Sequence, residues 1–197
     1  MNNQRLLEQI RFIVEIDKLK TIFRQSFIMD KSRNENDAEH TWHLSVMAII
    51  LLEHANDVDL DILKVLKMIL IHDLVEIDAG DTFLYDEQGY SDKEERELKA
   101  AKRLFGLLPK NQQKEYFSLW REFEVKETPE ARFAGALDRL HPLLHNYYTE
   151  GHTWKKHGLT SDRVLAKNKQ IEWGSNELWR FAESLIHDAV RKGYLEK

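Results

Sequence analysis

Apolar residues recur along most of this chain at three- and four-residue spacing, which is the period of an amphipathic α-helix. Only three prolines and eight glycines interrupt the pattern, and alternating strand-like runs are negligible. The sequence therefore predicts an all-α protein. Its length of 197 residues fits one compact helical domain over residues 1–197.

The first half of the chain predicts three helices separated by polar segments, at about residues 4–27, 37–55 and 59–79. The first is expected to bend near Asp17 and to turn one apolar face inward. That face consists of Leu6, Leu7, Ile10, Ile13 and Val14. Asn36 or Asp37 can cap the second helix, which is apolar nearly all round and is therefore expected to lie centrally.

The second half predicts five more helices. They are expected to run from Ser91 to Gly106, from Pro109 through Phe123, from Pro129 through His141, and over residues 161–173 and 176–192. Ser91 to Glu94 has the form of a capping box, and Thr128-Pro129 is typical of a helix start. Residues 151–159 are expected to form a loop.

Charged residues at apolar positions point to the chemistry. The apolar run that starts at Met68 ends in the adjacent His72 and Asp73, with Glu76 one helical turn after His72. Burying a histidine beside an aspartate is unfavourable unless the two are paired or bind a cation. Asp138 lies on a later predicted helix among small and apolar residues. These positions indicate a metal site.

Composition narrows the class of protein. The formal net charge is −5, and no basic block is interleaved with aromatic residues, which argues against a nucleic-acid polymer as partner. The longest uncharged apolar run, residues 41–52, is too short to span a membrane, and the first residues do not resemble a signal peptide. A cytoplasmic protein with no membrane partner is expected.

Candidate metal ligands lie on three predicted helices: His40 on one, His72 and Asp73 on the next, and Asp138 on a later one. Helices packed ~8–10 Å apart can bring such side chains to one ion. Cysteine is absent, so the ligands must be nitrogen and oxygen atoms. Such a set, with positions open to water or substrate, suits Co, Mn, Fe, Zn or Mg.

This ordered set resembles the HD-domain metal-dependent phosphohydrolases, whose pattern is a first His, a His-Asp pair and a distant Asp on separate helices. The likeness is greater to the small bacterial 5′-deoxynucleotidase group and its eukaryotic relatives. Three motifs carry it: Leu19-Lys20-x-Ile22-x-Arg24, Arg33-x-Glu35-Asn36-x-x-Glu39-His40, and His72-Asp73-x-x-Glu76-x-x-x-Gly80-Asp81. The match is densest over residues 17–83 and resumes around Asp138.

The resemblance implies a metal-site core over residues 24–141 and C-terminal helices over residues 161–192. One divalent ion would be held by His40, His72, Asp73 and Asp138. Glu76 would serve as general acid/base. The implied reaction releases orthophosphate from a nucleoside 5′-monophosphate, preferably a deoxyribonucleotide, and the implied assembly is a homodimer.

For the substrate, the resemblance implies that Arg24 and Arg33 face the phosphate and that Asp81 contacts a sugar hydroxyl. Arg33 has the alternative of pairing with Glu35 or Glu39. One residue departs from the group: Gln25 stands where the group has a tryptophan. This departure leaves the nucleoside preference open.

Two other functions stay open on the sequence alone. The same metal site could cleave another phosphoester, a nucleoside triphosphate or an alarmone. Alternatively, the chain could be a nucleotide-binding regulatory module in which the metal only organises the fold. Glu76 and the two arginines favour catalysis, because a structural site has no use for them.

Several other histidines are possible members of a functional site. His187-Asp188 repeats the central dipeptide, but no carboxylate follows at the same spacing, so we interpret it as a coincidence. His141, one turn after Asp138, is a candidate for the edge of the site, and His43 is expected in the helix bundle. The segment His152 to His157 is expected at the surface, with a lid as the alternative.

Overall fold

The computed structural model describes residues 3–197, and helices dominate it, which confirms the all-α prediction. The α-helices are α1 (Gln4–Ile16), α2 (Asp37–Leu51), α3 (Ile62–Ile71), α4 (Glu76–Ala79), α5 (Lys93–Phe105), α6 (Lys110–Val125), α7 (Pro129–Tyr148), α8 (His152–Lys156), α9 (Ser161–Asn168), α10 (Ile171–Gly174) and α11 (Asn176–Arg191). Three short 3-10 helices are η1 (Asp17–Thr21), η2 (Leu52–His54) and η3 (His72–Val75). The strands are β1 (Phe23–Phe27) and β2 (Asn34–Asn36).

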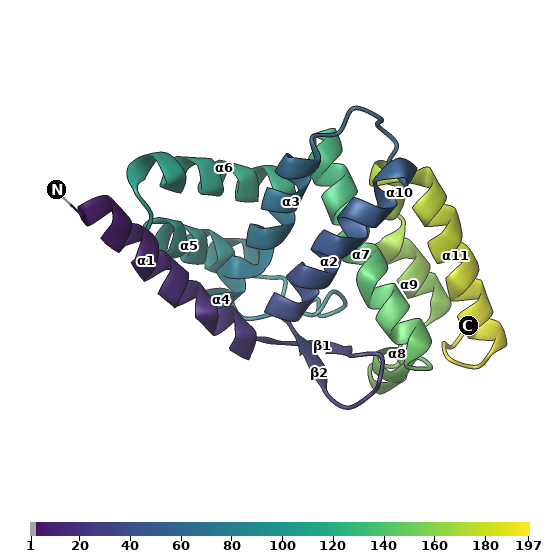
Figure 1. Cartoon of the computed structure of the whole chain (residues 1–197). Coiled ribbons are helices and arrows are strands. Elements are labelled where there is room, and N and C mark those ends of the chain that lie inside the picture. The colour runs from purple at the N-terminus through teal and green to yellow at the C-terminus, as the bar shows by residue number, and fades with distance from the viewer. Residues whose placement is uncertain (1–2) are drawn as a thin grey trace.

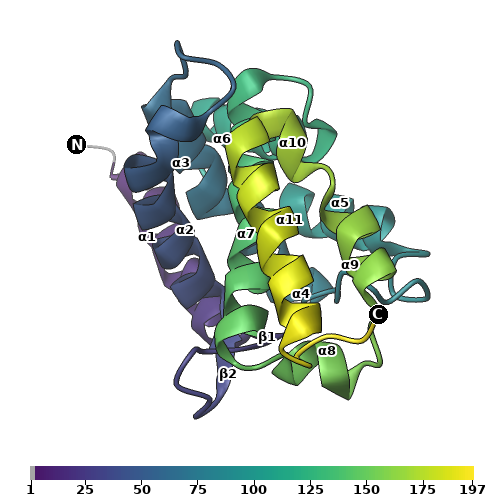
Figure 2. The ribbon, with the colours of Figure 1, turned by 90° about the vertical axis from the view of Figure 1, so that its right-hand side faces the viewer.

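Helix α7 runs through the middle of the bundle, with α2 and α3 on one side and α9, α10 and α11 on the other (Figure 1). Figure 2 shows α11 lying along α7. Buried side chains of these helices form the larger hydrophobic core, which includes Leu44, Ile69, Phe133, Leu137 and Ile186. One face of α7 is thus covered by the C-terminal helices.

A second hydrophobic core joins the N-terminal segment to α5 and α6. Its buried members include Phe12 of α1, Leu74 of η3, Phe105 of α5 and Trp120 of α6. Since η3 follows α3 directly, the His72-Asp73 pair lies where the two cores meet.

A small two-stranded sheet corrects the prediction that the first helix reaches Phe27. Strands β1 and β2 are antiparallel, with Phe23 opposite Asn36 and Phe27 opposite Asn34. Because Asn36 both ends β2 and caps α2, the hairpin fixes Arg24 beside the first turn of α2. Five residues of strand are too few to stand out from a helical pattern.

The predicted inner face of α1 is a second correction. Its apolar residues, from Leu6 to Val14, are 47–67% exposed, and Phe12 is the buried residue of the helix. The periodicity identifies an apolar face but does not say what covers it.

Some helix starts also differ. Helix α3 begins after Asp61, whose carboxylate accepts the backbone N–H groups of Leu63 and Lys64, rather than at Asp59. The expected capping box at Ser91 does not form, and the expected loop at residues 151–159 contains α8. The Thr128 cap of α7 is confirmed. Within residues 3–197, no helix combines the length and apolarity needed to cross a membrane.

Candidate metal centre and pocket

Four side chains from three parts of the chain meet in the interior: His40 of α2, His72 and Asp73 of η3, and Asp138 of α7. The Nε2 atom of His40 lies 3.0 Å from Asp138 Oδ1 and 3.7 Å from Asp73 Oδ2. The Nε2 atom of His72 lies 3.1 Å from Asp73 Oδ1 and 3.7 Å from Asp138 Oδ1. The structure therefore brings the sequence-predicted ligand set together.

The start of α2 positions His40. The Asn36 side chain accepts the backbone N–H of Glu39 at 3.0 Å, and the Glu39 carboxylate accepts the backbone N–H of Asn36, so a full capping box forms. Such a box satisfies the free N–H groups of the first helical turn. His40 directly follows Glu39 and is completely buried.

His72 presents a free nitrogen to two carboxylates. Its Nδ1–H donates to the carbonyl oxygen of Ile69 at 2.7 Å, so the neutral ring carries a lone pair on Nε2. Among residues 3–197 this buried Nε2 has no hydrogen-bond partner. A lone pair between the carboxylates of Asp73 and Asp138 is a place for a cation. This set of nitrogen and oxygen atoms fits a divalent metal.

The pKa shifts of these side chains also favour a positive charge between the two carboxylates. Burial alone lowers the pKa of His72, but Asp73 and Asp138 outweigh it and raise this pKa to about 10. The metal-free ring therefore carries a proton on Nε2, and a bound cation would take the place of that proton and leave the ring neutral. Burial works against the charged form of Asp73, yet His72 and Arg24 hold the pKa of Asp73 below its ordinary value. Burial lowers the pKa of His40 to about 4, so this ring stays neutral and can bind a metal.

A second group of acids surrounds Arg24. One guanidinium nitrogen, Nη1, donates to Asp73 Oδ2 at 2.9 Å and to Asp37 Oδ1 at 3.2 Å. Glu76 is buried nearby, and burial together with Asp73 and Asp37 raises the pKa of Glu76 well above its ordinary value. The protonated form of Glu76, which can donate a proton, is therefore favoured.

A pocket opens beside these side chains. His72, Asp73, Glu76 and Asp138 are part of its lining. Its other lining residues include cations and aromatic rings: Arg24, Lys93, Lys126 and Arg139, and Phe83, Tyr85, Phe123 and Trp154. The lining also includes the carboxylates of Asp81, Glu97 and Glu124, so the pocket offers cations for a phosphate group beside acids that could hold a metal or a hydroxyl group.

Of the three predicted substrate residues, Arg24 and Asp81 line the pocket and Arg33 does not. Asp81 lines the pocket, and burial raises the pKa of its carboxyl group. Arg24 also lines it, although its guanidinium already binds carboxylates. Arg33 is not among the lining residues; it pairs with Glu39 through two hydrogen bonds of 2.6 and 2.8 Å. The alternative of an Arg33–Glu39 pair is thus the one observed, and phosphate contact by Arg33 stays a prediction.

Sequence reasoning missed three cations of the pocket. Lys93 is bound to Glu97 at 2.8 Å, and Lys126 stands over the Phe123 ring, 4.5 Å from its centre. Arg139 has a buried Nε without a hydrogen-bond partner in the described chain. Only Arg139 gave a signal, its position next to Asp138; the two lysines reach the pocket through tertiary folding alone.

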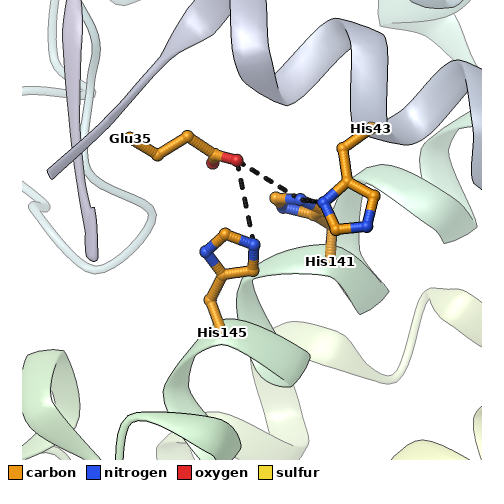
Figure 3. Close-up of side chains that lie close together, drawn as sticks. All are labelled: Glu35, His43, His141 and His145. Carbon is orange, nitrogen blue, oxygen red and sulfur yellow. Dashed lines mark hydrogen bonds and ion pairs between the residues drawn. The ribbon is translucent and has the colours of Figure 1, made fainter. Parts of the chain in front are cut away.

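The other candidate histidines do not line the pocket. His141 does not line the pocket; its Nδ1 lies 3.2 Å from Nδ1 of His40. Together with Glu35, His43 and His145 it forms a buried cluster (Figure 3). Asp188, by contrast, accepts hydrogen bonds from Tyr147, Arg191 and Lys192 on α7 and α11. His187-Asp188 therefore takes no part in the candidate centre.

Gln25 is hydrogen-bonded to two residues of α8. Its backbone carbonyl accepts from the Thr153 hydroxyl at 3.2 Å, and its side chain accepts from Lys156 at 3.3 Å. Thr153 and Trp154 reach the pocket as well. The segment from His152 to His157 therefore forms part of the pocket wall next to Gln25, the residue that differs from the family pattern.

Comparison with known proteins identifies the fold. A family model described as HD domain matches residues 16–179. A predicted metal-dependent phosphohydrolase from Magnetospirillum magnetotacticum is 58% identical, covers 98% of this chain and 97% of its own, and superposes with a TM-score of 0.95. A conserved hypothetical protein from Pyrococcus furiosus is 25% identical, covers 92% and 99%, and gives 0.65.

Curated relatives are more distant in sequence. The 5′-deoxynucleotidase HDDC2 of Bos taurus is 29% identical over 136 residues, which are 68% of this chain and 64% of that protein. The Homo sapiens protein of the same name is 28% identical, with coverage of 68% and 65%. The matched region thus spans slightly less than two thirds of the length of these relatives. The family match over most of the chain and the converging His and Asp side chains agree, and this chain belongs to the HD domain family.

Proposed function

We propose that this chain is a divalent-metal-dependent phosphohydrolase that releases orthophosphate from nucleoside 5′-monophosphates, with a preference for deoxyribonucleotides. The observation that carries the proposal is the unpartnered Nε2 of His72, which faces the carboxylates of Asp73 and Asp138 at the edge of a pocket that also holds Lys126 and Arg139. The substrate class is supported by the relatives named 5′-deoxynucleotidase.

The ligands would be the Nε2 atoms of His40 and His72 and a carboxylate oxygen each from Asp73 and Asp138. A bound divalent ion lowers the pKa of its water to about 7 and so supplies a nucleophile at neutral pH. Co, Mn, Fe, Zn and Mg all suit this ligand set. Arg24 holds Asp73 Oδ2 at 2.9 Å, which leaves Oδ1 of the same carboxylate turned toward His72.

Glu76 would move the proton. Burial and the neighbouring acids raise the pKa of its carboxyl group and so favour the protonated form, and its Oε2 has no hydrogen-bond partner in the described chain. As water attacks phosphorus and the bond from phosphorus to O5′ breaks, Glu76 would donate its proton to O5′, and the resulting carboxylate would take up a proton of the attacking water, which returns Glu76 to its starting state. The departing nucleoside then leaves as a neutral alcohol.

The phosphate charge would be met by pocket cations. Arg139 and Lys126 line the pocket, and burial lowers the pKa of Lys126, which a nearby phosphate dianion would raise again. Asp81 would contact the sugar hydroxyl. The rings of Phe83 and Tyr85 lie in the same wall as Gln25 and offer the base a stacking surface where the group's tryptophan is absent.

The testing experiment measures phosphate release from ribo- and deoxyribonucleoside mono- and triphosphates and an alarmone, with chelator-treated protein re-supplied separately with Co, Mn, Mg and Zn. Metal-dependent orthophosphate from deoxynucleoside 5′-monophosphates is expected. Activity confined to triphosphates or the alarmone would assign the site to another phosphoester. Nucleotide binding without turnover under every metal would favour the regulatory module.

The repeated dipeptide provides a matched control. Asp73→Asn should abolish metal binding and activity, since it removes a ligand charge, whereas Asp188→Asn should retain both. Equal loss in the two variants would show that the effect is general destabilisation.

We also propose a homodimer. Helix α2 exposes Trp42, Val46, Ile49 and Ile50, which fall on one side of the helix, and α1 exposes its own apolar face. Extended exposed apolar faces are typical of interfaces, and a second copy of this chain is the occupant we propose.

A further inference from the structure

A buried cluster of polar side chains lies behind the candidate metal centre, outside the pocket. It consists of Glu35 of β2, His43 of α2, and His141 and His145 of α7 (Figure 3). His141 Nε2 lies 3.0 Å from His43 Nδ1 and 3.4 Å from Glu35 Oε1, and His145 Nε2 lies 3.8 Å from the same Glu35 oxygen. Glu35, His141 and His145 are buried and His43 is partly buried, and burying polar side chains is unfavourable unless they are hydrogen-bonded to one another.

The cluster meets the metal centre at Nδ1 of His40, which lies 3.2 Å from Nδ1 of His141 and 3.7 Å from Oε2 of Glu35, so that His141 is the nearer partner and the one within hydrogen-bond distance. A histidine that binds a metal through Nε2 carries its hydrogen on Nδ1. His40 Nδ1–H therefore donates to His141 Nδ1. Because a neutral imidazole has one hydrogen, His141 must carry its own on Nε2, and that Nε2–H donates to His43 Nδ1.

We propose that His141 is a positioning residue for the ligand His40: the buried chain from His40 to His141 to His43 fixes the His40 ring and the nitrogen that it offers to the metal. The proposal rests on the proposed function only in needing a metal bound to His40. Hydrogen-bonded partners of a metal-binding histidine set its tautomer and strengthen its basicity. His72 has the corresponding partner in the Ile69 carbonyl, so both histidines of the centre are held from behind.

The same cluster has the composition of a second cation site, since one ligand atom from each member lies within 4.8 Å of the others. The His40 contact decides against this use. A cation would need the lone pair of His141 Nε2, whose hydrogen is required there while His40 donates to Nδ1. His145 is not part of the hydrogen bonds that link His40, His141 and His43, because its Nδ1–H donates to the Phe27 carbonyl at 2.8 Å.

Metal affinity of variants tests the proposal without any substrate. His141→Phe keeps a ring but removes the acceptor, and we expect roughly 10–100-fold weaker zinc or cobalt binding by calorimetry and an altered visible spectrum of the cobalt protein. His141→Asn, whose Oδ1 can accept from His40, should recover most of the affinity. His145→Gln is the matched control and should bind one metal per chain as tightly as the wild type.

A direct measurement covers the case in which a variant does not fold. Nitrogen-15 shifts of the imidazoles in the zinc-loaded wild type should show the hydrogen of His40 on Nδ1 and that of His141 on Nε2. The reverse assignment, unchanged affinity in His141→Phe, or two zinc ions per chain with one lost in His145→Gln would overturn the proposal. A wild type that binds no metal would instead refute the proposed function.

Discussion

His72-Asp73 and His187-Asp188 have the same two side chains in the same order, but their surroundings differ. Asp73 lies among His40, His72 and Arg24 in the interior, whereas Asp188 is bound by residues of α7 and α11 near the surface. A dipeptide alone therefore does not identify a metal site. What distinguished the first pair in the sequence was the apolar run before it and Glu76 after it.

Glu76 is the residue whose role is most directly testable. Glu76→Gln keeps the size of the side chain but removes the proton that the carboxyl group donates. We expect the turnover number to fall about 10²–10⁴-fold. Metal content, measured by mass spectrometry after dialysis, should stay at the wild-type level. Full activity in this variant would show that the assigned proton donor is wrong.

Glu35 should make stability depend on pH. Burial raises its pKa from 4.5 to about 8, so the folded protein binds this proton more tightly than the unfolded chain. Its stabilising contribution is complete below pH 4.5 and is lost as pH rises through 8. Glu35→Gln removes that loss, so the metal-free variant should exceed the wild type at pH 8.5 by up to ~4 kcal/mol.

The measurement is urea unfolding of metal-free protein at several pH values. The two proteins should converge near pH 4.5, where Glu35 is protonated in both states. A variant that is less stable than the wild type at pH 8.5 would contradict the assignment.

At the scale of elements, periodicity located most helices but not what surrounds them. The apolar spacing of α1 was visible, yet its expected inner face is exposed, because the pattern is the same for a core and for an interface. Strand β1 was missed because its five residues are too few to stand out from the helical pattern that precedes them, although the hairpin with β2 is local. The caps at Asn36 and Thr128 were predictable because each depends on neighbouring residues only.

The packing of α10 against α7 depends on a close backbone approach at Gly174. A Cβ atom placed there would lie 2.3 Å from the carbonyl oxygen of Arg132, well inside van der Waals contact. Gly174→Ala should therefore lower the free energy of unfolding by about 1–3 kcal/mol, in the range of overpacked interiors. Urea unfolding measures this, and an unchanged midpoint would mean that α10 can move away from α7.

At the scale of the whole molecule, the candidate site combines residues that are about one hundred positions apart, such as His40 and Asp138. Resemblance to a family found the four candidate ligands because their order along the chain is part of the pattern. It did not find Lys126. That lysine follows the last residue of α6 in a left-handed backbone conformation and reaches the pocket from there, outside any motif of the family. The roles of all these residues remain proposals.

Metal binding should stabilise the entire fold, because the candidate ligands lie where the two hydrophobic cores meet. At a free metal concentration 100 times the dissociation constant, the linked stabilisation is about 2.7 kcal/mol. Thermal unfolding should therefore shift upward when zinc or cobalt is added to chelator-treated protein. Asp73→Asn should show no such shift; an equal shift in this variant would place the stabilising metal elsewhere.

The homodimer is tested by light scattering, which should give a molar mass about twice the 23.4 kDa of one chain. Ile49→Asp places a charge in the exposed apolar stripe of α2 and should produce monomers. Val58→Asp is the control, since Val58 is 93% exposed and lies outside that stripe. A wild type of single-chain mass would refute the proposal.

The packing of helix α7 limits how far the chain can be shortened without losing the candidate site. This helix carries Asp138 and His141 toward the centre, while Phe133 and Leu137 on the same helix belong to the core that α10 and α11 complete. The C-terminal helices thus contribute none of the candidate ligands yet hold one of them in place. A shortened chain ending after α7 would keep every motif of the family and lose the rigidity that makes the motifs a site.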